Sequence, residues 1–180
     1  MRRVITLILF IAFISHDVRA QTEIKVSPMQ LLWRDVHVGA EFAINPNFGL
    51  EPRLMFDHTS IQLFDYLVDS ERYGLALEAK FYPKPDDGLD RFYTGMYVKG
   101  RTGNSVYQDQ RILRNRVALG FLAGYKWVSA KNIVAELGVG VGRALYDELL
   151  HGEVGASVPI SQIPFLRTDF VTRAAIGYRF

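Results

Sequence analysis

The chain has 180 residues, of which 49% are hydrophobic and 22% are charged, and it contains no cysteine. A chain without cysteine has no disulfides, no thiolate metal ligands and no lipoprotein processing site. Its 21 basic and 19 acidic residues nearly balance, so charge does not favour nucleic acid as a partner.

Residues 1–20 have the pattern of a targeting segment. Arg2 and Arg3 form a basic start, and an apolar run over residues 4–14 follows. This run of about eleven residues is too short to cross a bilayer as a helix. We therefore expect a secretory signal peptide cut after Ala20, rather than an uncleaved anchor. Its removal takes away three basic residues and one acidic residue and leaves 18 of each in residues 21–180, which fit one domain.

The rest of the chain shows a period of two, with apolar side chains alternating with polar, charged or small ones. This pattern is typical of strands whose two faces meet different surroundings. It predicts strands at 21–33, 36–44, 48–56, 73–82, 91–101, 112–127, 132–144 and 167–180. Three longer connections lie between them: 57–72, whose apolar residues have the spacing of a short helical turn, the polar segment 102–110, and 146–165. No later apolar run approaches about eighteen residues, so no transmembrane helix is predicted.

The face that alternates with the apolar one carries equal numbers of acids and bases. These residues are Glu41, Glu51, Arg53, Glu78, Lys80, Lys99, Arg116, Glu136, Asp169 and Arg173. A soluble sandwich would leave them in water, whereas a closed barrel would bury them in its lumen, where charges must pair. Eight strands put both chain ends on one side and most long connections on the other. We predict an all-β fold, a closed eight-stranded antiparallel transmembrane β-barrel of up-and-down order, too narrow for a wide pore.

The last predicted strand ends on Phe180, and Tyr178 precedes it on the same face. A terminal aromatic with apolar residues at alternate positions resembles the last strand of bacterial outer-membrane barrels, which the barrel-assembly machinery reads. We expect Tyr178 and Phe180 to act as this assembly signal. Together with other aromatics near predicted strand ends, they would form an interfacial girdle: Tyr73, Tyr125 and Trp127.

The most distinctive segments are rich in turns, glycines and aromatics: RNRVALGFLAGYKWVSAKNIVAELGVGVGRAL, FYPKPDDGLDRFYTGMYVKG and the ending AIGYRF. They resemble an uncharacterised family of small outer-membrane barrels found in Bacteroidota. The resemblance covers most of residues 24–180. It implies a barrel in the bacterial outer membrane, of the size of the OmpA and OmpX transmembrane domains, and it carries no catalytic residue across.

Two classes of function remain. The first is a non-enzymatic barrel, structural or partner-binding, in which the outer loops do the work because loops on a rigid scaffold usually carry function. The loops 57–72 and 146–165 are partly apolar, so they either pack on each other over the barrel mouth or dock a partner. The expected partners are outer-membrane lipid, the barrel-assembly machinery and other outer-membrane proteins.

The second class is a lipid A-modifying hydrolase. His58 and Ser60 have the His-x-Ser spacing of eight-stranded lipid A deacylases, and the pair lies at the outer end of the third predicted strand. The acid that orients the imidazole would be one of three: Asp57, Asp65 or Glu71. Against this, Ile61 stands where an asparagine normally follows the serine. His37 and His151 have no metal-ligand spacing, and we expect no metal or cofactor.

Overall fold

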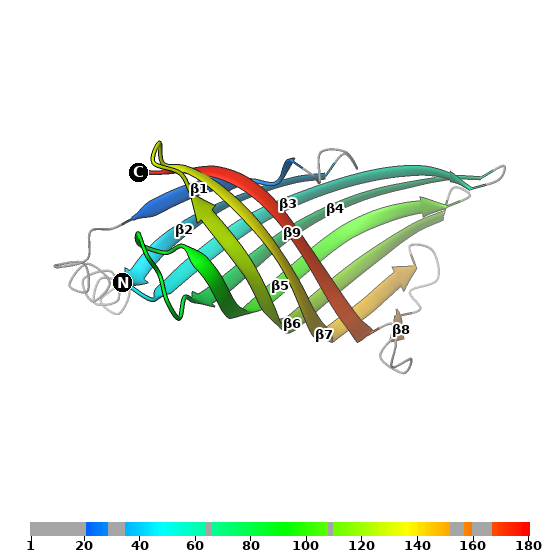
Figure 1. The fold of residues 1–180 in the computed structure, drawn as a ribbon. Coiled ribbons are helices and arrows are strands. Elements are labelled where there is room, and N and C mark those ends of the chain that lie inside the picture. The colour runs from blue at the N-terminus through cyan, green and yellow to red at the C-terminus, as the bar shows by residue number, and fades with distance from the viewer. Residues whose placement is uncertain (1–20, 29–34, 64–65, 108–109, 152–156, 160–166) are drawn as a thin grey trace, which may run out of the picture.

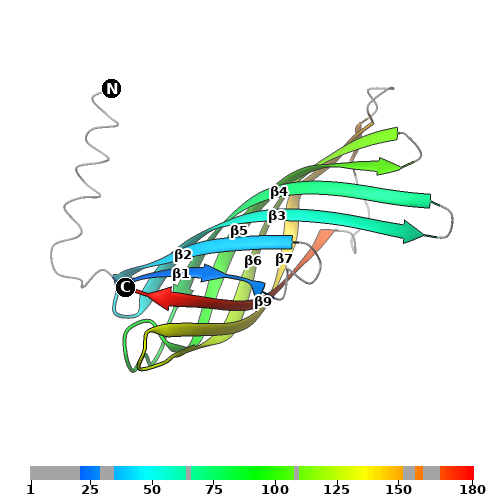
Figure 2. The ribbon, with the colours of Figure 1, turned by 90° about the horizontal axis from the view of Figure 1, so that it is seen from above.

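The computed structural model describes residues 21–28, 35–63, 66–107, 110–151, 157–159 and 167–180. Residues 1–20, on which the predicted signal peptide falls, lie outside this set. The described residues form one antiparallel sheet that closes on itself (Figures 1 and 2). Its strands are β1 (Thr22–Val26), β2 (Asp35–Asn45), β3 (Phe48–Leu63), β4 (Tyr66–Phe81), β5 (Arg91–Tyr107), β6 (Gln110–Val128), β7 (Ile133–His151), β8 (Ser157–Pro159) and β9 (Thr168–Arg179). No described helix is long and apolar enough to span a membrane.

The ring closes through the first and last strands. From β1 to β7 each strand pairs with its neighbour in the chain, and β9 pairs with both β7 and β1. The short β8 pairs with the far end of β7 and stands outside the ring. The barrel proper therefore has eight strands, β1–β7 and β9, and the predicted closed eight-stranded antiparallel barrel is confirmed.

The alternation of the sequence separates an outer face from an inner one. Outward residues such as Leu119, Leu137 and Val139 are 40%, 54% and 67% exposed, whereas Ala118 and Glu136 are fully buried in the lumen. Each of the eight barrel strands contributes exposed apolar side chains to the outer wall. A continuous apolar band of this kind on a folded protein indicates contact with an apolar phase or a partner.

Three strand pairs run well past the ring. The β3–β4 pairing continues from Asp57 and Arg72 to Leu63 and Tyr66, β5 and β6 pair as far as Tyr107, and β7 extends to His151. The helical turn predicted within 57–72 is wrong. The loops predicted at 102–110 and 146–165 are also wrong over residues 102–107, 110, 146–151 and 157–159, which are strand, and their other residues up to 165 lie outside the described part of the structure. Beyond the ring both faces of a hairpin meet the same surroundings, so cross-strand hydrogen bonds hold the strands without any apolar alternation.

The two ends of the barrel differ. Phe180 N donates to Thr22 O at 2.9 Å, so the start of β1 and the end of β9 lie together. We call this end of the barrel the terminal end. The connections there are tight: Asn45 Oδ1 caps the turn into β3 by accepting from the backbone N–H groups of Asn47 and Phe48 at 2.9 Å. The long hairpins project from the opposite end, which we call the hairpin end (Figure 2).

The first strand is shorter than predicted. β1 ends at Val26, whereas the predicted strand covers 21–33, of which residues 29–33 lie outside the described part.

Candidate functional site

The lumen of the barrel is filled by charged side chains. Each comes from an inward position of its strand and is at most 7% exposed. They are Glu23 and Lys25 of β1, Glu41 of β2, Glu51 and Arg53 of β3, Glu78 and Lys80 of β4, Lys99 of β5, Lys126 of β6, Glu136 of β7, and Asp169, Arg173 and Arg179 of β9. Six acids thus face seven bases in a space from which water is largely excluded.

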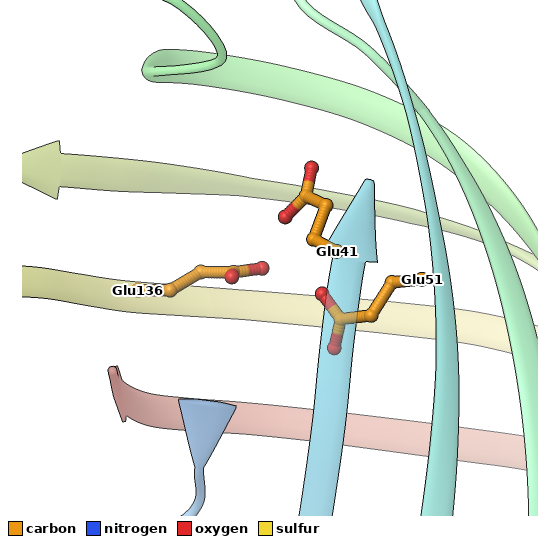
Figure 3. Close-up of side chains that lie close together, drawn as sticks. All are labelled: Glu41, Glu51 and Glu136. Carbon is orange, nitrogen blue, oxygen red and sulfur yellow. The ribbon is translucent and has the colours of Figure 1, made fainter. Parts of the chain in front are cut away.

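Three carboxylates converge inside the lumen. Figure 3 shows Glu41, Glu51 and Glu136 pointing toward one another, and one oxygen atom of each lies within 4.8 Å of the others. Lys25 Nζ lies 2.7 Å from Glu51 and 2.8 Å from Glu136, and it also contacts Glu41. Lys80 Nζ lies 2.8 Å from Glu51, 2.7 Å from Glu136 and 3.3 Å from Glu41. A set of carboxylate oxygens suits a divalent cation, but here two ammonium groups supply the compensating charge.

Arginines extend this network toward the hairpin end. Arg173 contacts Glu51 and Glu78, and its Nε lies 2.7 Å from Glu136. Arg53 also contacts Glu78 and lies 3.4 Å from Glu51. Because every acid in this group has at least two cationic neighbours, the removal of one residue leaves others in place to share the charge.

The terminal end is sealed. Arg179 binds Glu23 with two nitrogens at 2.8 and 2.9 Å and donates to the backbone oxygen of Leu89 at 3.0 Å. This bond ties the β4–β5 connection under the barrel, where Leu89 is buried in a cluster with Tyr82 and Tyr93. Lys126 adds contacts of 2.8 Å to Glu23 and 2.9 Å to Glu41.

Glycines on β6 and β7 make room for two lumen tyrosines. A Cβ at Gly138 would lie 2.7 Å from the Tyr93 hydroxyl, and one at Gly120 would lie 2.6 Å from the Tyr97 ring. Such distances are too short for any side chain, so each tyrosine needs a glycine at the position that it contacts. The Tyr97 hydroxyl donates to Asp169 at 2.7 Å. The space that the inward glycines leave is therefore taken by aromatic rings.

A polar cavity of about 420 Å³ remains in the hairpin half of the lumen. Its wall includes Arg53, Lys99 and Arg101. At its rim His37 Nε2 lies 2.9 Å from Asp57. Arg53 and Glu78, which form part of the cavity wall, also belong to the ionic network, so the cavity borders the charges that fill the lumen.

The structure brings nine of the ten predicted lumen charges into the buried interior. Arg116 is partly exposed at 19% of its side chain and donates to the backbone oxygen of Thr168 at 2.8 Å. Four of the lumen charges named above were absent from the predicted set: Glu23, Lys25, Lys126 and Arg179. Lys25, Lys126 and Arg179 stand between apolar or aromatic outward neighbours, so the same alternation would have found these three near the strand ends.

The residues of the hydrolase alternative lie outside the ring. His58 and Glu71 are directly opposite each other on β3 and β4, and His58 Nδ1 lies 3.7 Å from Glu71 Oε1. Both side chains are about half exposed. Ser60 follows on the same face of β3, paired across the hairpin with Asp69, and its side chain is outside the described part of the structure.

The predicted assembly residues lie on the outer wall at the terminal end. Tyr178 and Phe180 are both exposed, and their rings meet edge to face with centroids 5.1 Å apart. The exposed rings of Tyr125 and Trp127 also touch, with centroids 4.6 Å apart.

Among solved structures, the barrel is similar to a major outer membrane protein from Thermus thermophilus. The TM-score is 0.58 and the identity 14%, and the match covers 91% of this chain and all of that one. This likeness shows a shared fold. No curated protein matches the chain. A family model described as "Protein of unknown function (DUF3575)" matches residues 4–162, so the chain belongs to the DUF3575 family.

Proposed function

We propose that this protein is a non-enzymatic barrel of the bacterial outer membrane, of OmpA-like size and from a member of the Bacteroidota, that binds partners through its outer hairpins. A cleaved signal peptide would send it across the inner membrane. The terminal end would face the periplasm and the hairpins the exterior. The apolar outer band, with exposed aromatics such as Trp127 and Tyr178 near strand ends, supports a position in lipid.

The filled lumen is the observation that favours a binding role over transport of solutes through the barrel. Lys25 and Lys80 hold three glutamates from β2, β3 and β7 in one buried cluster, and Arg179 ties the β4–β5 connection across the terminal end. Solute has no path through such a barrel. The surfaces left for binding another protein are the hairpins of β3–β4, β5–β6 and β7, for which other outer-membrane proteins are the proposed partners.

The test is site-specific photo-crosslinking in cells. A photoreactive amino acid at Glu71 or Asn104, both exposed on the hairpins, is expected to give a discrete adduct with another outer-membrane protein. The control is the same amino acid at Lys131, exposed in the turn between β6 and β7 at the other end. A barrel that reaches the outer membrane and shows a heat-modifiable gel shift, yet gives no hairpin adduct, would contradict the binding role.

The second candidate is a lipid A-modifying hydrolase, and the His58–Glu71 pair is the observation that favours it. In this reaction Ser60 would attack an acyl ester while His58 takes its proton and passes it to the leaving lipid A hydroxyl. Water activated by His58 would then release the fatty acid from Ser60, and Glu71 would orient the imidazole. Mass spectrometry of lipid A from expressing cells tests it. Loss of one acyl chain with the wild type, but not with Ser60→Ala, would support the hydrolase, and unchanged lipid A would exclude it.

A further inference from the structure

One arginine stands on the outer wall of the barrel instead of in the lumen. Along β7 the outward positions run Val139, Val141 and Arg143, and Arg143 is exposed. It lies beside Leu119 of β6 and Thr168 of β9 in the ladder. In the described part of the structure no carboxylate lies within ion-pair distance of it. A charge in such a place is costly in lipid unless it meets headgroups or a counter-charge.

The height of Arg143 indicates headgroups. Ile133 begins β7 and pairs with the girdle residue Tyr178 at the terminal end, and Arg143 follows it by ten positions. With a rise of about 3.3 Å per residue and a strand tilt of about 40°, Arg143 stands roughly 25 Å above Ile133, which is the height of the apolar band of an outer-membrane barrel. Tyr146, an exposed aromatic, follows three residues later, where an outer girdle belongs.

An apolar trough of about 860 Å³ crosses the outer wall from Phe48 of β3 to Phe170 of β9 and includes Val141, the outward residue before Arg143 on β7. Small residues such as Thr94 and Ala123 form its base, and Phe121, Val141 and Phe170 rise around it. Phe121 and Phe170 both pair with Val141, which is the outward residue next to Arg143. Phe170, Val139 and Phe121 are 70%, 67% and 65% exposed, among the most exposed apolar side chains of the wall.

We propose that Arg143 and this trough form a specific lipid site, which binds the phosphate of a membrane lipid at the guanidinium and one acyl chain in the trough. The argument is charge complementarity: a guanidinium binds phosphate through two parallel hydrogen bonds, and the groove that leads away from it is almost entirely apolar. The inference rests on the proposed function, because it requires the barrel to lie in a membrane with its hairpin end at the outer surface.

Native mass spectrometry of the full barrel in dodecyl maltoside micelles tests the site. Titration with dioleoyl phosphatidylglycerol is expected to show one tightly retained lipid. Dioleoylglycerol, which lacks the phosphate, and inorganic phosphate, which lacks the chain, are each expected to bind at least about tenfold more weakly. Equal retention of the two lipids would refute a role for the phosphate, and equal binding of inorganic phosphate would refute the trough.

Two variants separate the two halves of the site. Arg143→Gln and Ala123→Phe, which fills the base of the trough, are each expected to weaken phosphatidylglycerol binding at least about tenfold. Lys131→Gln, the loss of an exposed charge at the other end, should leave it unchanged. All variants must keep the heat-modifiable gel shift, which shows that they fold. Unchanged binding by Arg143→Gln in a barrel located in the outer membrane would refute this site alone. Absence of the wild type from the outer membrane would instead refute the proposed function.

Discussion

Two neighbouring positions of β7 test which face of the wall meets lipid. Leu137 points outward and is 54% exposed, and Glu136 points into the lumen. Leu137 follows Ile133 by four positions, which places it roughly 10 Å into an apolar band of about 25 Å, near mid-membrane. An arginine there has no headgroup within easy reach. Leu137→Arg is therefore expected to be about 2–4 kcal/mol less stable than Leu137→Ala, which removes the same side chain without adding a charge.

Glu136→Gln provides the comparison on the other face. It removes one charge from the lumen, but Lys25 and Lys80 keep their contacts with Glu51, and Arg173 keeps Glu51 and Glu78. No cation is left alone, so the cost should stay below the roughly 3–5 kcal/mol of an ion pair that loses its sole partner. We expect Glu136→Gln to be milder than Leu137→Arg.

The assay is urea titration of folding into phosphatidylcholine vesicles, with the folded fraction read from the heat-modifiable band on a gel. A difference of 2–4 kcal/mol corresponds to about a 30- to 700-fold change in the folding equilibrium. Equal stability of Leu137→Arg and Leu137→Ala would show that this face does not meet lipid. A Glu136→Gln variant less stable than Leu137→Arg would show that the lumen charges do not share their partners as described.

Three further predictions concern assembly, packing and conductance. Deletion of Phe180 is expected to lower outer-membrane levels and induce envelope stress, while the purified, refolded barrel loses at most about 1.5–3 kcal/mol; unchanged levels on an immunoblot would count against an assembly signal. Gly138→Ala should cost about 1–3 kcal/mol in the same urea titration, because the new Cβ would lie 2.7 Å from the Tyr93 hydroxyl. Gly100→Ala, whose Cβ meets nothing within 4 Å, is the matched control and should be neutral. In planar bilayers the wild type should show no stable ion conductance, and discrete open-channel steps would contradict a sealed lumen.

The alternation of the sequence was enough to predict the closed barrel and the facing of residues within it. A strand of the ring lies between lipid and a polar lumen. The polarity of each of its side chains therefore indicates the face on which that residue lies. That is why Leu137 and Glu136 could be assigned to opposite faces without a structure. The same alternation of outward and inward positions places Lys126 and Arg179 on the lumen face. The same logic failed at 57–72, because a hairpin beyond the ring meets one environment on both faces and its strands need no alternation.

Only the tertiary structure decided which charges meet. Lys25 and Glu136 are 111 positions apart and become partners because β9 pairs with both β1 and β7 and so brings these two strands close together in the closed ring. The seal of the terminal end by Leu89, the fit of Tyr93 against Gly138, and the trough that includes Val141 likewise depend on strand register around the whole ring. The local sequence indicates whether each residue faces lipid or the lumen. Which side chains meet inside the barrel depends on how the strands are staggered around the closed ring, and the sequence of a single strand does not specify that stagger.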